Sequence, residues 1–237
     1  MRRAPYGREW IAAKGRAAKL QSRMHTLASR IDATLLAAEA TGSQIEALVR
    51  EAASLGCVAA CVNPVHVERA VRAAAGTGLR IASVAGFPLG ASPASAKIDE
   101  CRFALDRGAA ELDIVIPIWA VVDGRIDLLE QEIATLLGAT AGATRKLILE
   151  VGLMPAGALE AVAAAINRAR PEFAKTGTGY GRGATVEDTA TLRRLLDPSI
   201  KIKAAGGIRT RAQALSLLDA GADRIGTSRA REILDEN

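Results

Sequence analysis

Short apolar runs alternate with longer helical patterns from residue 30 onward. The runs are rich in Val, Ile, Leu and Ala, and the stretches between them are rich in Ala, Leu, Glu and Arg. Short buried runs of this kind predict strands, and most of the intervening stretches are long enough for a helix. The predicted strands are 31–35, 57–62, 80–84, 111–116, 146–151, 172–175, 201–204 and 224–226. Clear helical stretches are 43–54, 95–107, 156–168 and 185–196.

Eight strands that recur about every 25–35 residues, each followed by a helical stretch, indicate a closed parallel barrel. The length of 237 residues fits a single (β/α)8 TIM barrel, a fold that typically takes about 250 residues. An open, doubly wound sheet of eight strands is the alternative that the pattern leaves open. Hydrophobic residues make up 49% of the chain and aromatic residues only 3%, which favours Ala-rich helices on aliphatic strands over a β-sandwich.

The positive charge of the chain is concentrated at its N-terminus. Residues 1–30 hold eight of the 31 Lys and Arg residues and one of the 26 acids, which gives +7 there and −2 for the remaining 23 bases and 25 acids. We therefore expect a basic helical extension over 1–28 and the barrel over 29–237. The extension would cover the bottom of the barrel or a neighbouring subunit. An arm for RNA or membranes and an organelle targeting segment are weaker readings, and no nucleic-acid partner is expected for the barrel.

Cysteine content and hydropathy suggest a cytoplasmic location. The three cysteines, Cys57, Cys61 and Cys101, form no disulfide framework and no zinc-binding spacing. No apolar run is long enough to span a membrane, and the N-terminus lacks the apolar core of a secretion signal. No cofactor or metal site is indicated, because no convincing His and Glu cluster is present.

Three charged residues interrupt the apolar strands. Asp113 lies inside the run Glu-Leu-Asp-Ile-Val-Ile, Lys175 ends the run Phe-Ala-Lys, and Lys203 ends the run Ile-Lys-Ile-Lys. The lysines are 28 residues apart, one βα unit, so we expect them on neighbouring strands about 4.8 Å apart. Mutual repulsion would leave one lysine uncharged at lower pH than a free lysine, and a neutral amine is the nucleophile of Schiff-base chemistry. A buried salt-bridge network without chemistry is the alternative.

Glycine-rich segments follow the last three predicted strands. They read Thr-Gly-Thr-Gly-Tyr-Gly at 176–181, Gly-Gly-Ile-Arg-Thr at 206–210 and Gly-Thr-Ser at 226–228. Glycine lets backbone N–H groups approach an anion closely, and the loops after strands 7 and 8 of barrels frequently bind phosphate. The segments therefore predict a site for a phosphate monoester, with Ser228 among the donors.

Taken in order, these segments resemble the deoxyribose-phosphate aldolase family across about residues 27–235. The matching segments are Ile-Asp-Ala-Thr-Leu-Leu (31–36), Ala-Cys-Val-Asn-Pro (60–64), Val-Ala-Gly-Phe-Pro-Leu-Gly-Ala (84–91), Gly-Ala-Ala-Glu-Leu-Asp-Ile-Val (108–115), Ala-Lys-Thr-Gly-Thr-Gly (174–179), Lys-Ala-Ala-Gly-Gly-Ile-Arg-Thr (203–210) and Arg-Ile-Gly-Thr-Ser (224–228). The resemblance implies a class I aldolase that needs no cofactor. It would cleave 2-deoxy-D-ribose 5-phosphate reversibly to D-glyceraldehyde 3-phosphate and acetaldehyde.

The resemblance also implies the role of each matching residue. Lys175 would form the imine, Lys203 would keep Lys175 partly unprotonated, Asp113 would relay protons through water, and Asp32 would hold Lys203. The residues implied in binding the substrate and its phosphate are Thr176, Gly179, Gly206, Gly207, Gly226 and Ser228, with Cys61 as a pocket residue or a small apolar filler.

Three positions depart from the family pattern. Ala33 stands where the family commonly has His, Gly177 where it has Ser, and Val151 where it has Thr, and each change is expected to remove a polar group near the mouth. Trp119 is a large residue that could reshape the mouth, although packing is the expected role. The departures leave open a related class I aldolase with another donor or acceptor aldehyde. A barrel that binds a phosphorylated metabolite without catalysis is the alternative from another class. Self-association into a homo-oligomer is expected, with no symmetry implied.

Overall fold

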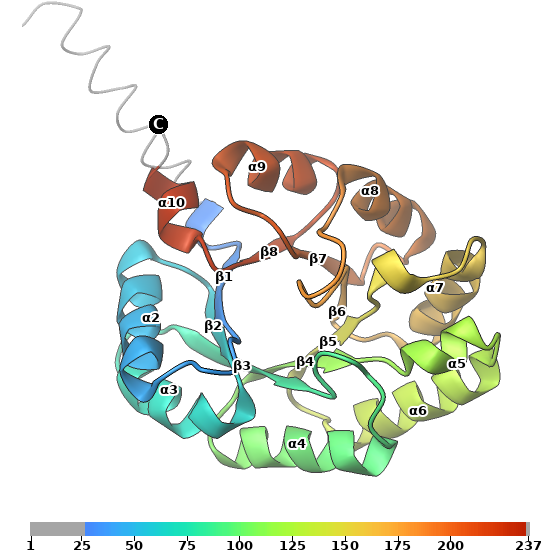
Figure 1. The fold of residues 1–237 in the computed structure, drawn as a ribbon, viewed down its shortest axis with the longest axis horizontal. Coiled ribbons are helices and arrows are strands. Elements are labelled where there is room, and N and C mark those ends of the chain that lie inside the picture. Colours follow the sequence, from blue (N-terminus) through green and yellow to red (C-terminus); the bar gives the residue numbers. More distant parts are fainter. Residues whose placement is uncertain (1–26, 236–237) are drawn as a thin grey trace, which may run out of the picture.

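The computed structural model describes residues 27–235, and within them eight parallel strands close into a barrel in the order of the sequence. The strands form a ring with the helices outside it (Figure 1). The strands are β1 (Ile31–Leu35), β2 (Ala59–Val62), β3 (Arg80–Ala85), β4 (Glu111–Val115), β5 (Thr144–Ile148), β6 (Phe173–Lys175), β7 (Lys201–Ala205) and β8 (Arg224–Thr227). Pairing of β1 with β8 closes the ring, which confirms the (β/α)8 barrel and excludes the open sheet.

Helices cover the outside of the barrel. They are α2 (Gly42–Leu55), α3 (Val67–Ala74), α4 (Ala94–Asp106), α5 (Ile118–Val122), α6 (Ile126–Ala139), α7 (Ala158–Ala169), α8 (Val186–Leu195), α9 (Arg211–Asp219) and α10 (Ala230–Asp235), with short 3-10 turns η1 (Pro64–His66) and η2 (Val151–Leu153). Side-chain caps fix several helix starts. Thr41 and Gln44 form a capping box at α2, and Thr210 and Gln213 form another at α9.

Side chains alternate along each strand between the layer under the helices and the inside of the barrel. One large apolar cluster joins outward-facing strand residues such as Ile31, Ile202 and Ile225 to the buried sides of the helices. Inside the ring, the apolar cluster is small and consists of Cys61, Ala82 and Val84. The rest of the barrel interior is therefore free to hold polar groups, and it does so.

The expectation for the extension concerns mostly residues outside those described. Of 1–28, only Leu27 and Ala28 are described, and both are buried in the apolar cluster. Cys57, Cys61 and Cys101 are free and buried, in line with the absence of a predicted disulfide framework. Among residues 27–235, no helix is long and apolar enough to cross a bilayer.

Candidate active site

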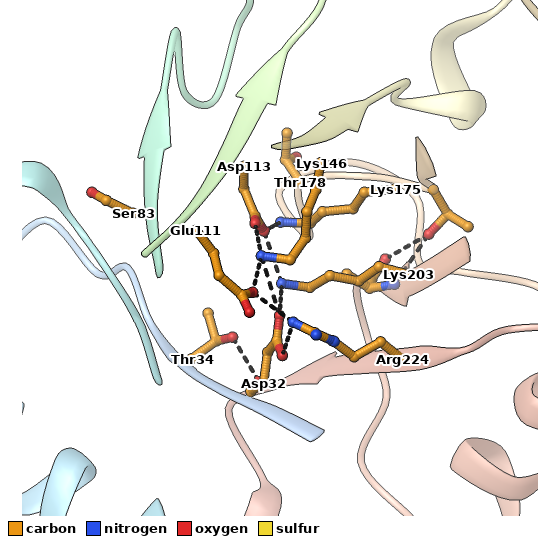
Figure 2. A network of polar contacts seen from close by, with 12 residues as sticks. Asp32, Thr34, Ser83, Glu111, Asp113, Lys146, Lys175, Thr178, Lys203 and Arg224 are labelled. Atoms are coloured by element: carbon orange, nitrogen blue, oxygen red, sulfur yellow. Dashed lines mark hydrogen bonds and ion pairs between the residues drawn. The ribbon is translucent and has the colours of Figure 1, made fainter. Parts of the chain in front are cut away.

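Seven charged side chains fill the middle of the barrel. They project inward from six strands and meet around two aspartates (Figure 2). The set is Asp32 from β1, Glu111 and Asp113 from β4, Lys146 from β5, Lys175 from β6, Lys203 from β7 and Arg224 from β8. All seven are less than 9% exposed, so each charge depends on the others for stabilisation.

Asp113 is the centre of this charged set. Its Oδ1 accepts a hydrogen bond from Lys146 Nζ at 2.8 Å, and its Oδ2 accepts from both Lys175 Nζ and Lys203 Nζ at 2.8 Å. The register pairs Lys175 with Lys203 on adjacent strands, as the spacing of 28 residues predicted. Lys203 also donates to Asp32 Oδ2 at 2.5 Å, so the expected contact between these two residues is present.

Charge counting shows that the set favours the loss of one proton. Three carboxylates, Asp32, Glu111 and Asp113, face four cations, Lys146, Lys175, Lys203 and Arg224, so the set carries one excess positive charge when every group is ionised. The set becomes balanced if a single amine gives up its proton. Buried charge is costly unless it is paired, so loss of that proton is favoured.

The pKa shifts identify Lys175 as the group that gives up its proton. Burial lowers the pKa of Lys175, Asp113 opposes this effect, and the nearby charge of Lys203 lowers the pKa further. Burial would also lower the pKa of Lys203, but Asp113 and Asp32 outweigh it and raise that pKa above its ordinary value. Desolvation is thus a larger cause of the shift at Lys175 than the repulsion between lysines that the sequence suggested. The structure therefore sets a lysine that loses its proton more readily than a free lysine beside one that holds its proton more tightly.

The carboxylates stay ionised beside these lysines. Burial alone would raise the pKa of Asp113, but Lys146, Lys175 and Lys203 together hold it well below its ordinary value. The pKa of Asp32 is lowered in the same way, by Lys203, Lys146 and Arg224 against the effect of burial. Asp113 in this arrangement is a negative charge 2.8 Å from the amine of Lys175.

Lys175 opens onto a cavity of about 380 Å³ at the C-terminal ends of the strands. Barrel enzymes place their active sites at this end. Of the charged set, only Lys175 lines the cavity. The other lining residues are Thr34, Leu35, Leu36, Ala37, Thr178, Gly179, Tyr180, Ala205, Gly206, Gly207, Ile208, Arg209, Gly226, Thr227 and Ser228.

Five predicted phosphate-binding residues line this cavity. They are Gly179, Gly206, Gly207, Gly226 and Ser228, of which Gly226 belongs to β8 and the others to the loops after β6, β7 and β8. A Cβ added at Gly206 would lie 3.2 Å from Gly179 Cα, and Gly206 has a φ of +107°, so glycine is required where these two loops touch. Arg209, which sequence reasoning did not single out, adds a cation to the lining of the same cavity.

Two predicted substrate residues lie outside the cavity lining. Thr176 is buried, and its hydroxyl bridges to the backbone of Ala205, donating to the carbonyl at 3.3 Å and accepting from the N–H at 3.1 Å. Cys61 is fully buried in the small apolar cluster inside the barrel, and burial raises the pKa of its thiol to about 11. Contacts of these two residues with substrate stay predictions, and their positions favour structural roles.

The departures from the family pattern are found at different places. Ala33 belongs to the outer apolar cluster, because odd-numbered positions of β1 face the helices, so the expectation that it lies at the mouth is wrong. Val151 packs in the same cluster at the start of η2, after the end of β5. Gly177 does lie in the loop after β6, where a Cβ would come within 2.8 Å of Glu150 Oε1. Trp119 is 48% exposed and lines a groove beside the mouth rather than packing in the core.

Sequence reasoning missed three members of the charged set. Lys146 Nζ lies 2.6 Å from Glu111 Oε2, and Arg224 Nη1 lies 2.5 Å from the same oxygen. Each of these residues stands near the start of a strand, where a charge normally reaches solvent. A signal was available for Glu111, because it lies two residues before Asp113 and so on the same face of β4. Lys146 and Arg224 pair in register with Asp113 and Lys203, which only the closed barrel shows.

Comparisons with known proteins agree on one family. No family model matches the chain. A deoxyribose-phosphate aldolase of Mycobacterium avium is 44% identical over 215 residues, which cover 88% of this chain and 96% of the relative. The relative of that name from a Geobacillus strain is 38% identical over 213 residues, with 89% and 96% covered.

Solved structures show the same likeness. A structure titled as the unique tetrameric structure of deoxyribose phosphate aldolase from Aeropyrum pernix superposes with a TM-score of 0.83 at 35% identity, covering 91% of this chain and 95% of that one. A structure titled QR15, an aldolase, gives a TM-score of 0.84 at 34% identity, covering 88% and 94%. Because the identity extends over nearly the whole barrel that carries the paired lysines and the glycine-lined cavity, the chain belongs to the deoxyribose-phosphate aldolase family.

Proposed function

We propose that this protein is a class I aldolase that cleaves 2-deoxy-D-ribose 5-phosphate to D-glyceraldehyde 3-phosphate and acetaldehyde through a Schiff base on Lys175. One observation carries the assignment of the lysine. Lys175 is the member of the charged set that reaches the cavity, and it is also a buried lysine whose pKa is lowered by burial and by the neighbouring Lys203. A neutral amine at the edge of a cavity is what attack on an aldehyde requires.

The reaction begins at the C1 aldehyde of the open-chain sugar. Neutral Lys175 adds to C1, and uptake of one proton from solvent with loss of water gives a protonated imine. Asp113 Oδ2 lies 2.8 Å from Lys175 Nζ, so its negative charge stabilises the cation that forms. The protonated imine then accepts the electron pair of the C2–C3 bond, which breaks to give an enamine on Lys175.

Proton transfers complete the cycle. The C3 hydroxyl gives up its proton as C3 becomes the aldehyde of glyceraldehyde 3-phosphate, and we assign the uptake of this proton to Asp113 through a water molecule. The buried set then keeps a constant charge, because the positive charge lost when the imine becomes an enamine is replaced by the proton gained. The same proton returns to C2 of the enamine, and hydrolysis of the resulting imine releases acetaldehyde and regenerates Lys175.

Binding of the substrate follows the shape of the cavity. The phosphate would lie against the wall formed by Gly179, Gly206, Gly207 and Ser228, with Arg209 nearby as a cation. The C1 end would then point to Lys175, which lines the same cavity. Lys203 and Asp32 would not touch the sugar, and they act by holding the charges around Lys175.

Borohydride trapping tests the proposal. The protein is incubated with deoxyribose 5-phosphate, reduced, and digested for peptide mapping by mass spectrometry. We expect a stable adduct on Lys175 that disappears in Lys175→Ala, whereas Lys201→Met, a change at an exposed lysine near the start of β7, is expected to leave it intact. Absence of an adduct with both the sugar and acetaldehyde would reduce the charged set to a structural network.

A second experiment separates this reaction from that of a related aldolase. Deoxyribose 5-phosphate is made to compete with sugars that would be cleaved to a different donor or acceptor aldehyde, and the substrates are ranked by kcat/KM. We expect the phosphorylated deoxy sugar to rank first. A higher rank for another aldehyde would keep the imine mechanism and change the substrate.

The relative from Aeropyrum pernix is described as tetrameric, and we propose that this protein is also a homo-oligomer acting in the cytoplasm on small phosphorylated sugars. Three free, buried cysteines are compatible with a reducing compartment. Light scattering coupled to gel filtration measures the assembly, and a monomeric mass would contradict it.

A further inference from the structure

The loop that follows β6 carries a feature that the mechanism above does not use. This loop begins directly after Lys175, and its segment 178–180 forms a wall shared by two hollows. One hollow is the catalytic cavity. The other is a groove of about 420 Å³ with mostly apolar walls, which include Leu89, Trp119 and Leu153. The position of segment 178–180 therefore sets the shape of the mouth.

Glu150 is the group that fixes this segment. It follows β5, is only 3% exposed, and accepts two hydrogen bonds from Thr178 at Oε2, one from the backbone N–H at 3.0 Å and one from the hydroxyl. Its backbone is left-handed, with φ 49° and ψ 57°, a conformation that is unfavourable for a residue with a side chain. Such strain persists only where the surroundings hold the residue in place.

Thr178 passes this constraint on to Tyr180. The Thr178 hydroxyl accepts a hydrogen bond from the Tyr180 N–H at 3.1 Å. The Tyr180 hydroxyl donates to the carbonyl of Leu36 at 3.2 Å, and its ring meets Phe87 edge-on with 5.5 Å between centroids. Because Leu36 follows β1 and Phe87 follows β3, this chain of contacts spans the barrel mouth.

The other carboxylate oxygen of Glu150 lies against glycines. A Cβ added at Gly177 would come within 2.8 Å of Oε1, and one added at Gly181 would come within 3.3 Å. Among the described residues, Oε1 has no hydrogen-bond partner and is shielded from solvent. The loop therefore wraps closely around this carboxylate, and the two glycines make that approach possible.

We propose that Glu150 is a positioning residue for the aldolase reaction, which holds segment 178–180 so that the phosphate-binding wall of the cavity has its working shape. The inference rests on the proposed function. Lys175 is held separately, through Asp113 and through its own strand, so Glu150 acts on the binding of the phosphorylated end and not on imine formation. That separation makes the role measurable.

The test compares two reactions in the same variants. Cleavage of deoxyribose 5-phosphate depends on the phosphate wall, whereas borohydride trapping of acetaldehyde requires only Lys175. Glu150→Ala removes the acceptor, and Thr178→Val removes the hydroxyl donor. For both, we expect KM for the sugar phosphate to rise about tenfold or more, the loss typical of one buried charge-assisted hydrogen bond, with the rate of acetaldehyde trapping within about twofold of the unaltered protein.

Conservative variants and a matched control sharpen the result. Glu150→Gln keeps an acceptor oxygen and Thr178→Ser keeps the hydroxyl, so both should remain within about threefold of the unaltered KM. Glu187→Gln removes an exposed carboxylate in the first turn of α8 and should change nothing. The double variant Glu150→Ala/Thr178→Val should be no worse than either single variant, because both break the same interaction.

Two results would overturn the proposal. One is an unchanged KM in both Glu150→Ala and Thr178→Val. The other is a loss of acetaldehyde trapping equal to the loss of cleavage, which would mean that Glu150 acts on Lys175. If Glu150→Ala fails to fold by circular dichroism, Thr178→Val and its serine counterpart decide the matter. Failure of the aldolase assignment itself would be seen separately, as absence of trapping in the unaltered protein.

Discussion

Replacing Lys203 with methionine removes one of the two ammonium groups that share Asp113 Oδ2. Each Nζ lies 2.8 Å from that oxygen, so the two nitrogens are separated by at most twice this distance, about 5.6 Å. With an effective dielectric constant of about 20, two positive charges at that separation repel by about 3 kcal/mol. This energy disfavours the protonated form of Lys175.

The expected consequence is a smaller population of the nucleophile. At neutral pH, removal of about 3 kcal/mol of repulsion reduces the neutral fraction of Lys175 on the order of 100-fold. The direction of the pH effect follows from the lowered pKa of Lys175. The pKa of Lys175 is lowered in the intact protein, so trapping rises with pH through that lowered pKa, and in Lys203→Met the whole profile moves to higher pH.

The assay is the initial rate of acetaldehyde trapping by borohydride, measured by intact mass from mildly acidic to alkaline pH. Lys201→Met is the matched control, because it removes a lysine from the same strand at an exposed position. Thermal unfolding of each variant checks that the barrel is intact. If Lys203→Met and the unaltered protein show the same pH midpoint and the same rate at neutral pH, the electrostatic account of Lys175 is refuted.

Four further experiments test the roles of Asp113, Lys146, Ser228 and Cys61. Asp113→Asn should move the pH midpoint of acetaldehyde trapping downward, opposite to Lys203→Met, because Asp113 raises the pKa of Lys175, and it should also slow cleavage of the sugar phosphate. Lys146→Met should destabilise the protein by about 3–5 kcal/mol in urea unfolding, since it leaves two buried carboxylates short of a partner; a loss below about 1 kcal/mol would contradict this. Ser228→Ala should raise KM for the sugar phosphate several-fold with little change in acetaldehyde trapping, and equal effects on both would place Ser228 away from the phosphate. Cys61 should resist alkylation by iodoacetamide at neutral pH in the native protein, because it is fully buried and its pKa is raised to about 11, and rapid labelling would show that the interior opens.

The strands that hold the paired lysines could be predicted closely from the sequence. β6, predicted over 172–175, spans Phe173–Lys175, and β7 is one residue longer than predicted. The strand predicted over 146–151 was displaced, because β5 spans Thr144–Ile148 and Val151 begins a 3-10 turn. The apolar run Leu-Ile-Leu-Glu-Val continues past the end of the strand, and nothing in its composition indicates that Glu150 is left-handed.

The composition of the charged set was harder to predict than its location. Asp113, Lys175 and Lys203 were visible because each interrupts or ends an apolar run. Lys146 follows Arg145 at the start of a strand, where two adjacent bases look like a solvated edge. Only closure of the barrel shows that Lys146 faces inward while its neighbour Arg145 pairs with Glu172 outside. Long-range closure of this kind leaves no local trace in the sequence.

The charged interior also helps to determine the register in which the strands of the barrel pair. Side chains alternate between the two faces of a strand, so a slip of β6 by one residue would turn Lys175 into the layer beneath the helices and bring Ala174 inside. Such a slip would leave a lone ammonium among aliphatic side chains and remove one of the three lysine partners of Asp113, both at high energetic cost. An aliphatic interior would tolerate the same slip far more easily. The residues assigned to chemistry therefore also fix the register of the strands during folding. Replacing them all with apolar residues is expected to yield a stable barrel in which several strand registers are populated.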